Sequence, residues 1–190
     1  MSAIFSSPRT GEEMQKAIRL NAPDARIPIM KYSDICQMMG EYGPVKTIKE
    51  IYSRNGEKTL ILLQNPEKMN SGHWISLTIL PRSHTIYFFS SYGGKPDEEK
   101  NRWLDRMARV ASGQERNALN DGLKELHNRG WTIHYNDYPF QVEGDGSATC
   151  GIWTAAFLNM DLTPDEFEYF TRRNNLSYLD YYNAFFKRRE

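Results

Sequence analysis

Residues 149–158 read TCGIWTAAFL, and this segment is the strongest indication of the fold. From Gly151 to Leu158 the segment is apolar on nearly all sides rather than along one stripe. A helix that is apolar all round belongs in the interior of a protein. We therefore expect a buried central helix with Cys150 at its N-terminus.

Strands are predicted on the N-terminal side of this helix. Residues 74–80 place Ile75, Leu77 and Ile79 on the face that His73 begins, which is the two-residue period of a strand. Further strands are predicted at residues 58–63, 85–89 and 131–135. Because the strands are clustered and show few βαβ alternations, the fold class is predicted to be α+β. We expect a central, mostly antiparallel sheet flanked by helices.

The remaining helices are predicted from capping residues and apolar spacing. Residues 10–20 begin with capping-box spacing, and residues 33–39 form a short helix that Gly40 ends. Residues 163–166 begin another helix, with proline at the first helical position and an acid at the third. Three more helices are predicted from the sets Trp103, Leu104, Met107 and Val110, then Leu119, Leu123 and Leu126, and finally residues 177–186.

Composition limits the class of protein. The 190 residues suit one domain, 1–190, and the 24 basic residues balance the 24 acidic ones, so no nucleic-acid partner is indicated globally. The first ten residues lack the apolar core of a signal peptide, and no apolar run is long enough to cross a membrane. With Cys36 and Cys150 as the only cysteines, we expect a reduced, cytoplasmic setting, neither secreted nor membrane-bound.

Cys150 and His73 are the candidate nucleophile and base. A thiol at a helix N-terminus feels the positive end of the helix dipole, which favours the thiolate, and Gly151 leaves room for a substrate. His73 stands at the start of a strand, where Gly72 permits close approach and Trp74 can wall the ring. Taken alone, each is more often structural: a buried cysteine is common, and so is a half-exposed histidine.

Gln141 and Ser90 complete the candidate site. The amide of Gln141 lies nine residues before Cys150 and can donate to a developing oxyanion. A carboxylate is expected to orient the histidine, but the third strand ends in Phe89-Ser90-Ser91-Tyr92-Gly93. Ser90 or Ser91 is therefore predicted to orient His73 without supplying a charge.

Other chemistries lack their signatures. The sequence has no CxxC pair, no HExxH, no EF-hand loop, no Walker motif and no GxSxG elbow. We expect no metal and no cofactor.

Together these residues resemble the adenain-like and Ulp1-like cysteine peptidases, a clan with adenovirus-type maturation proteases and SUMO-type deconjugating enzymes. The resemblance rests on Gly72-His73-Trp74, on residues 87–93, on Gln141 and on Thr149-Cys150-Gly151. It implies a catalytic core at about 58–160 with a papain-like or adenain-like arrangement. It also implies Cys150 as nucleophile, His73 as general base and acid, and Gln141 as oxyanion donor. Ser90 departs from the family, which has Asp, Asn or Glu there.

The function expected from this resemblance is a cysteine endopeptidase, as in a viral or virus-like maturation protease that cuts after small residues such as glycine. The alternatives are a ubiquitin-like or SUMO-like deconjugating protease and a catalytically silent peptide-binding module. The expected partner is a polypeptide, either a viral capsid precursor or a ubiquitin-like protein, and the protein is expected to be a monomer. A nucleic acid or an activating peptide stays open as a further partner. A viral enzyme would act in the host cytoplasm, the virus factory or the virion.

Overall fold

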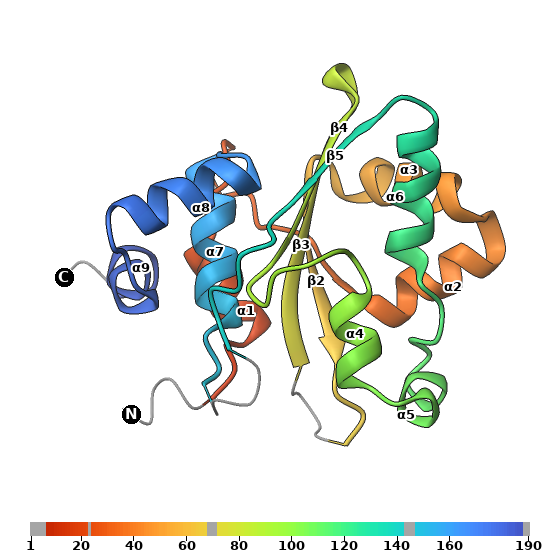
Figure 1. Ribbon diagram of the computed structural model, residues 1–190, viewed down its shortest axis with the longest axis horizontal. Coiled ribbons are helices and arrows are strands. Elements are labelled where there is room, and N and C mark those ends of the chain that lie inside the picture. Colours follow the sequence, from red (N-terminus) through yellow and green to blue (C-terminus); the bar gives the residue numbers. More distant parts are fainter. Residues whose placement is uncertain (1–6, 23, 68–71, 143–146, 188–190) are drawn as a thin grey trace.

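A five-stranded sheet runs through the middle of the molecule, with helices on both faces (Figure 1). The computed structural model describes residues 7–22, 24–67, 72–142 and 147–187. β2, β3 and β4 pair antiparallel, and the outer strands β1 and β5 join them in parallel. This arrangement confirms the predicted α+β class. In their order across the sheet the strands are β1 (Ile29–Lys31), β2 (Lys58–Gln64), β3 (Gly72–Leu80), β4 (Thr85–Ser90) and β5 (Thr132–Tyr135).

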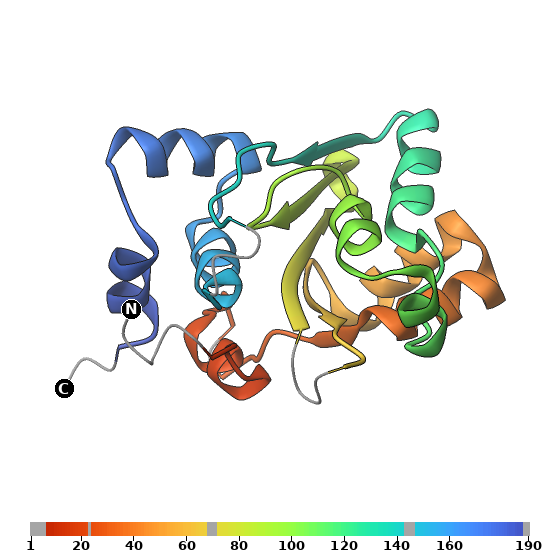
Figure 2. The ribbon, with the colours of Figure 1, turned by 60° about the horizontal axis from the view of Figure 1, so that its bottom comes forward.

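One helical layer covers the sheet face that carries Ile75, Leu77 and Ile79 (Figure 2). These side chains form a single buried cluster with apolar residues of α2, α3 and α6. Two short helices, α4 and α5, lie in the same layer near the end of the sheet that carries His73. The helices of this layer are α2 (Tyr32–Tyr42), α3 (Pro44–Asn55), α4 (Glu98–Trp103), α5 (Arg106–Ala111) and α6 (Ala118–Asn128).

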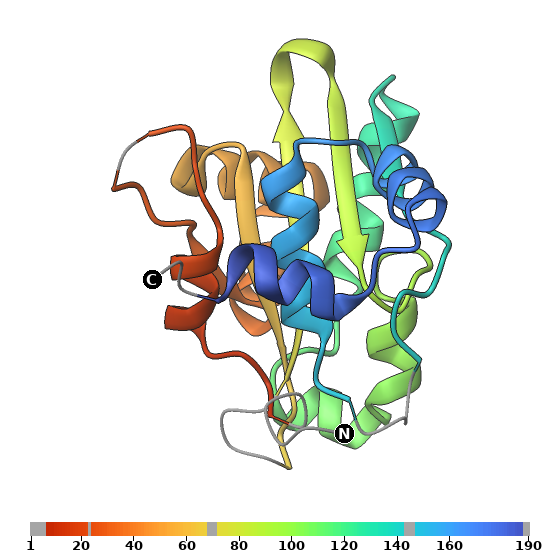
Figure 3. The ribbon, with the colours of Figure 1, turned by 90° about the vertical axis from the view of Figure 1, so that its left-hand side faces the viewer.

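The opposite layer contains the buried central helix. Every residue of α7 from Cys150 to Leu158 is buried, which confirms the prediction made from its apolar sequence. Phe157 stacks on Phe89 of β4 at 4.5 Å, and α9 lies across the outer side of α7 (Figure 3). The helices of this layer are α1 (Gly11–Ala17), α7 (Cys150–Met160), α8 (Pro164–Arg173) and α9 (Tyr178–Phe185).

Two helix boundaries differ from the predictions. The first helix ends at Ala17 instead of continuing to residue 20, because Ile18 adopts extended backbone angles. The second helix does not stop at Gly40 but continues to Tyr42, where Gly43 ends it with φ +78°. Gly43 then leads directly into α3, a helix that the sequence pattern did not reveal.

The prediction of one apolar helix face through Trp103, Met107 and Val110 was wrong. The chain is extended at Leu104, and the Asp105 carboxylate accepts a hydrogen bond from the Ala108 N–H at 2.8 Å to start α5 as a separate helix. Leu104 is buried, whereas Trp103, Met107 and Val110 are 41%, 82% and 53% exposed. The N-cap at Asp105 therefore breaks the periodicity that the apolar residues suggested.

The contact between α3 and α6 gives a test of the packing. A Cβ added at Gly122 of α6 would lie 2.7 Å from Ile48 Cγ1 and 3.0 Å from the Pro44 carbonyl oxygen. Alanine normally stabilises a helix relative to glycine, by about 0.5–1 kcal/mol. At Gly122 we expect overpacking to dominate, so that Gly122→Ala lowers the free energy of unfolding by about 1–3 kcal/mol.

Gly40 of α2 is the matched control, because the atoms nearest to a Cβ there belong to the flexible end of the Arg116 side chain, at 3.4 Å or more. Gly40→Ala is expected to raise the free energy of unfolding by about 0.5–1 kcal/mol in the same denaturant titration. Equal stabilisation by both substitutions would contradict the close α3–α6 contact.

Candidate active site

Cys150 is the first residue of α7, with Thr149 at the N-cap position. The Thr149 carbonyl accepts the first hydrogen bonds of the helix, so the thiol stands at the positive end of the helix dipole. Hydrogen bonding from the backbone at Trp74 and Gly151 also lowers the pKa of the Cys150 thiol. Each of these contacts favours the thiolate over the thiol.

His73 lies where the sheet becomes narrower. β4 ends at Ser90 opposite Ile75, while β3 extends as far as Gly72. The edge of β3 next to His73 is therefore not covered by β4. As a result, side chains from both helical layers reach the imidazole, Cys150 from α7 and Glu99 from α4.

Glu99 is the carboxylate that sequence reasoning missed. Its Oε2 lies 3.3 Å from His73 Nε2, and both side chains are at most 5% exposed. Ser90 stands between them: its Oγ lies 3.1 Å from His73 Nε2 and donates a hydrogen bond to Glu99 Oε2. Ser90 thus occupies the predicted place beside the histidine, but a negative charge accompanies it. No motif pointed to Glu99, because it lies nine residues beyond Ser90 in a polar segment on a separate helix.

The Cys150 thiol meets the other side of the imidazole. His73 Nδ1 is buried and makes no hydrogen bond of ordinary length and angle within the described residues. The Cys150 sulfur is nevertheless close enough to act on the ring as a hydrogen-bond partner and as a charge. Nε2 therefore faces Ser90 and Glu99, and Nδ1 remains for the thiol.

The electrostatics favour a thiolate–imidazolium pair. Burial lowers the pKa of His73, but the Glu99 carboxylate and Cys150 outweigh burial and raise this pKa above its usual value. Burial raises the pKa of Cys150, but the hydrogen bond and charge of His73 outweigh it and lower this pKa. By contrast, burial raises the pKa of the Cys36 thiol to about 11. The two buried cysteines, neither of them in a disulfide, therefore differ strongly in acidity.

Tyr92, rather than Trp74, stacks on the imidazole. The rings of Tyr92 and His73 lie 4.5 Å apart with an interplanar angle of 28°. The Trp74 indole belongs to the opposite core, where its Nε1 donates to the Arg9 carbonyl at 2.8 Å. Because neighbouring residues of a strand point to opposite faces, the Trp74 ring lies on the other face of the sheet from the His73 imidazole.

Gln141 is buried, and its side chain is hydrogen-bonded to Ser91. Ser91 Oγ donates to Gln141 Oε1 at 3.1 Å, and Gln141 Nε2 donates to the Ser147 carbonyl at 2.8 Å. Of the two serines considered as partners of His73, Ser90 lies beside the imidazole, whereas Ser91 holds the amide of Gln141. That hydrogen bond fixes which end of the amide donates. Of the predicted loop 144–147 before Cys150, residues 144–146 lie outside the described residues.

Asn136 connects the two halves of the site and was not predicted. It is fully buried, and its side chain bonds both the N–H of Ser90, at 3.2 Å, and the carbonyl of Ser90, at 2.7 Å. Its Nδ2 also donates to the Tyr138 carbonyl, in the segment that leads to Gln141. Asn136 thus satisfies the backbone where β4 ends and fixes the Gln141 segment beside it.

The two motif glycines serve packing. A Cβ at Gly72 would lie 2.3 Å from the Leu63 carbonyl oxygen, so glycine allows β2 and β3 to approach. A Cβ at Gly151 would lie 2.9 Å from both Arg9 Cγ and Met14 Sδ. The expectation that Gly151 leaves space for a substrate was therefore wrong, because side chains from the N-terminal segment and α1 fill that space.

The other histidines lie away from Cys150. His84 stacks on Trp131, the His134 ring meets the Tyr87 ring edge to face, and His127 Nδ1 lies 3.2 Å from the Trp131 carbonyl oxygen. These contacts place all three at the opposite end of β4 or along β5.

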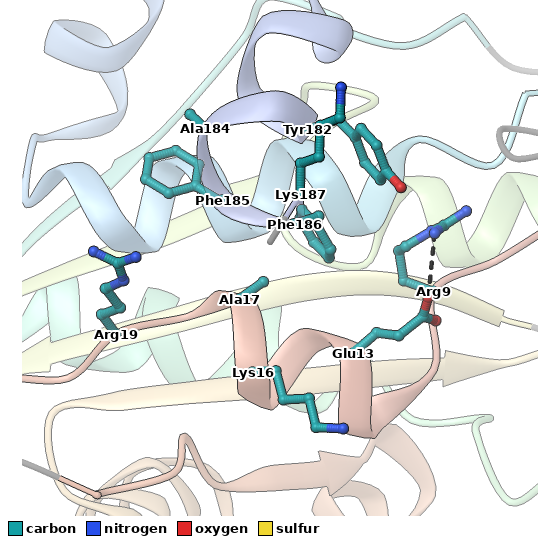
Figure 4. A pocket seen from close by; sticks show the side chains of 10 residues that line it. All are labelled: Arg9, Glu13, Lys16, Ala17, Arg19, Tyr182, Ala184, Phe185, Phe186 and Lys187. Carbon is teal, nitrogen blue, oxygen red and sulfur yellow. Dashed lines mark hydrogen bonds and ion pairs between the residues drawn. The ribbon is translucent and has the colours of Figure 1, made fainter. Parts of the chain in front are cut away.

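A separate cavity of about 430 Å³ lies between α1 and α9 (Figure 4). It is lined by charged side chains, among them Arg9 and its ion-pair partner Glu13 at 3.2 Å, and by aromatic rings of α9 and the residue that follows it. No thiol or imidazole lines it, so it is not the site of thiol chemistry. Within the described ranges no group of His, Cys, Asp and Glu could hold a metal ion, and no helix is long and apolar enough to span a membrane.

Comparison with known proteins gives one similar sequence. No family model matches the chain. The chain is 28% identical over 125 residues to an uncharacterized protein, V9, of Sputnik virophage, and the match covers 66% of this chain and 59% of that protein. The chain thus spans less than two thirds of the relative's length.

The solved structures that the chain resembles include Ulp1-like proteases. The yeast Ulp1 protease domain, solved in complex with Smt3, aligns over 93% of this chain and 72% of that chain, with 14% identity and a TM-score of 0.39. The central domain of an uncharacterized Legionella pneumophila protein aligns over 95% and 82%, with 13% identity and a TM-score of 0.38. The Chlamydia abortus effector ChlaDUB aligns over 67% and 61%, with 21% identity and a TM-score of 0.28. At these values the likeness does not assign the chain to a family.

The contact between Glu99 and His73 yields a pH-dependent prediction. In Glu99→Gln the carboxylate charge is lost, so the pKa of His73 falls, the imidazolium is lost at lower pH, and the pKa of Cys150 rises. The rate at which a thiol alkylator labels Cys150 near pH 6 should fall about tenfold for each unit of that rise. The measurement is the rate of Cys150 labelling from pH 5 to 10, located by mass spectrometry.

Glu98→Gln is the matched control, since Glu98 is the exposed neighbour on the same helix. Its profile should coincide with that of the wild type, and Cys36 should label slowly in all three proteins. A Glu99→Gln profile that matched the wild type would show that Glu99 does not act on the thiol.

Proposed function

We propose that this chain is a cysteine endopeptidase whose catalytic residues are Cys150, His73 and Glu99, with Gln141 as oxyanion donor. The observation that carries the proposal is that thiol, imidazole and carboxylate are buried together: His73 Nε2 lies 3.3 Å from Glu99 Oε2, and Cys150 and His73 shift each other's pKa. Acid, base and nucleophile are each buried and come from three different elements. Three chemically complementary groups in contact are more specific for nucleophilic catalysis than any one of them.

In the proposed reaction the Cys150 thiolate attacks the scissile carbonyl carbon and forms a C–S bond. The His73 imidazolium gives its proton to the leaving amine as the C–N bond breaks, which leaves a thioester on Cys150. Neutral His73 then takes a proton from water, whose oxygen attacks the thioester carbon and displaces the sulfur as thiolate. Glu99 orients the imidazole ring and stabilises the imidazolium.

Gln141 stabilises the oxyanion in each attack. Its Nε2 donates to the Ser147 carbonyl at 2.8 Å and to Ser147 Oγ at 3.3 Å, so one of these two hydrogen bonds is exchanged for one to the substrate oxygen. Because Ser91 holds Oε1, the amide keeps its donating end in place during the exchange. A donor that is oriented before the reaction stabilises the developing charge without reorganisation.

The proposed biological role is that of a viral or virus-like maturation protease acting on a polypeptide, with small residues such as glycine before the cut. The similarity to a virophage protein supports a virus-like origin. A capsid precursor is the substrate we propose, with the host cytoplasm, virus factory or virion as the place of action. Removal of a ubiquitin-like modifier is the second candidate, with the same chemistry at a glycine-ended tail.

A silent binding module is less well supported by the geometry. The sequence feature in its favour was the lack of a carboxylate at Ser90. Glu99 places a carboxylate 3.3 Å from the imidazole, which supports a complete catalytic site over a silent one.

Cleavage of a diverse peptide library tests the proposal. Wild type and Cys36→Ala should cut, Cys150→Ser should not, and Gln141→Ala should lose about 10²–10³ in kcat because one oxyanion donor is removed. The products, sequenced by mass spectrometry, should carry small residues before the cut.

The outcomes separate the candidate functions. Cleavage only after the glycine tail of a folded ubiquitin-like fusion would favour deconjugation over maturation. A folded protein that labels at Cys150 but cuts neither library nor fusion would contradict the endopeptidase and favour the binding module.

A further inference from the structure

The helix that carries Glu99, α4, buries no apolar side chain of its own against the rest of the protein. α4 is six residues long, and its buried residues are Glu99 and Lys100. Trp103, its largest apolar side chain, is 41% exposed. Helices shorter than about 12–15 residues are marginal in water. The position of α4 therefore depends on the polar side chains that it directs inward.

Lys100 is the central polar contact of α4. The residue is fully buried, and Nζ donates to the Gln114 carbonyl at 3.1 Å, to Asn101 Oδ1 at 3.1 Å and to Asn117 Oδ1 at 3.3 Å. An ammonium group has three donors, and here each finds an acceptor. Lysine is almost never fully buried without such partners. The ammonium also lies over the Tyr32 ring, 5.3 Å from its centre.

Asp97 fixes the start of the same helix. It is 4% exposed and adopts a left-handed conformation with φ +70°. Tyr32 Oη donates to Asp97 Oδ1, and the Asn120 N–H donates to Oδ2 at 2.8 Å. Asp97 and Lys100 thus hold the first turn of α4 on both sides of Glu99.

Gln114 links this network to the strands beside His73. Its fully buried side chain donates to the Gln64 carbonyl at 2.8 Å and accepts from the Gln64 N–H at 3.0 Å. Gln64 pairs with Gly72, the residue before His73. The backbone carbonyl of Gln114 accepts from Lys100, so one residue contacts both the Glu99 helix and the His73 end of the sheet.

We propose that Asp97, Lys100 and Gln114 are positioning residues that set the distance between Glu99 and His73, and thereby the charge state of the Cys150–His73 pair. The Glu99 carboxylate is held at Oε2, by Ser90 and His73, whereas its buried Oε1 has no hydrogen-bond partner within the described residues. A Coulomb interaction weakens as the separation grows. A shift of about 1–2 Å in α4 would therefore weaken the attraction between Glu99 and the His73 imidazolium, and with it the stabilisation of the Cys150 thiolate. This inference rests on the roles proposed for Glu99, His73 and Cys150.

The test uses two variants that change the network without touching the reacting groups. Lys100→Met preserves the length of the side chain but removes its three hydrogen bonds. Tyr32→Phe preserves the ring but removes the hydroxyl that donates to Asp97. Both should move the pH profile of Cys150 alkylation to higher pH, in the direction of Glu99→Gln, with labelling near pH 6 slowed about three- to tenfold.

The double variant Glu99→Gln/Lys100→Met should label Cys150 no more slowly than Glu99→Gln alone, because Lys100 acts through Glu99. Lys124→Met, at an exposed lysine of α6, is the control and should leave the profile unchanged.

A purely structural role gives a different result: the melting temperature falls but the alkylation profile stays where it is, and this would overturn the inference. If Lys100→Met fails to fold, Asn117→Ala removes a single acceptor and should shift the profile in the same direction by less. The readout does not depend on peptide cleavage. A shifted profile in a protein that cuts no peptide would therefore support the positioning role while contradicting the endopeptidase.

Discussion

The structure depends on one buried contact, the pairing of the Glu99 carboxylate with the His73 imidazole. A carboxylate removed from water is costly unless a charge or hydrogen bonds compensate it. His73 can compensate Glu99 when it is protonated, and the proton is available because Cys150 can release it to the ring. The two interactions therefore support each other, and the loss of either leaves a buried charge without a partner.

The fold brings these groups together by ending one strand early. β4 stops at Ser90, and the space beside His73 receives Cys150 from one helical layer and Glu99 from the other. Two polar side chains stabilise the end of β4. Ser90 donates a hydrogen bond to Glu99, and the Asn136 side chain bonds the backbone N–H and carbonyl of Ser90. Each helical layer alone would supply only half of the proposed site.

The sequence predicted the parts of the structure whose signal is local. The apolar run after Cys150 and the alternation after His73 each reflect burial along one element, and both were confirmed. Glu99 could not be predicted because its position follows from how α4 docks, and the residues that dock it are polar and scattered along the chain. For the same reason the choice between Ser90 and Ser91 as the partner of His73 required the structure, since adjacent residues at the end of a strand point to opposite faces.

The charge state of the His73 ring reports directly on its pairing with Glu99 and Cys150. Nitrogen NMR of labelled imidazole, titrated from pH 5 to 10 with the His73 signal assigned by His73→Gln, reports whether each ring nitrogen carries a proton. We predict that His73 keeps both ring protons well above pH 7, because Glu99 and Cys150 raise the pKa of this imidazole. A His73 that became neutral near the ordinary value of about 6.5 would contradict it.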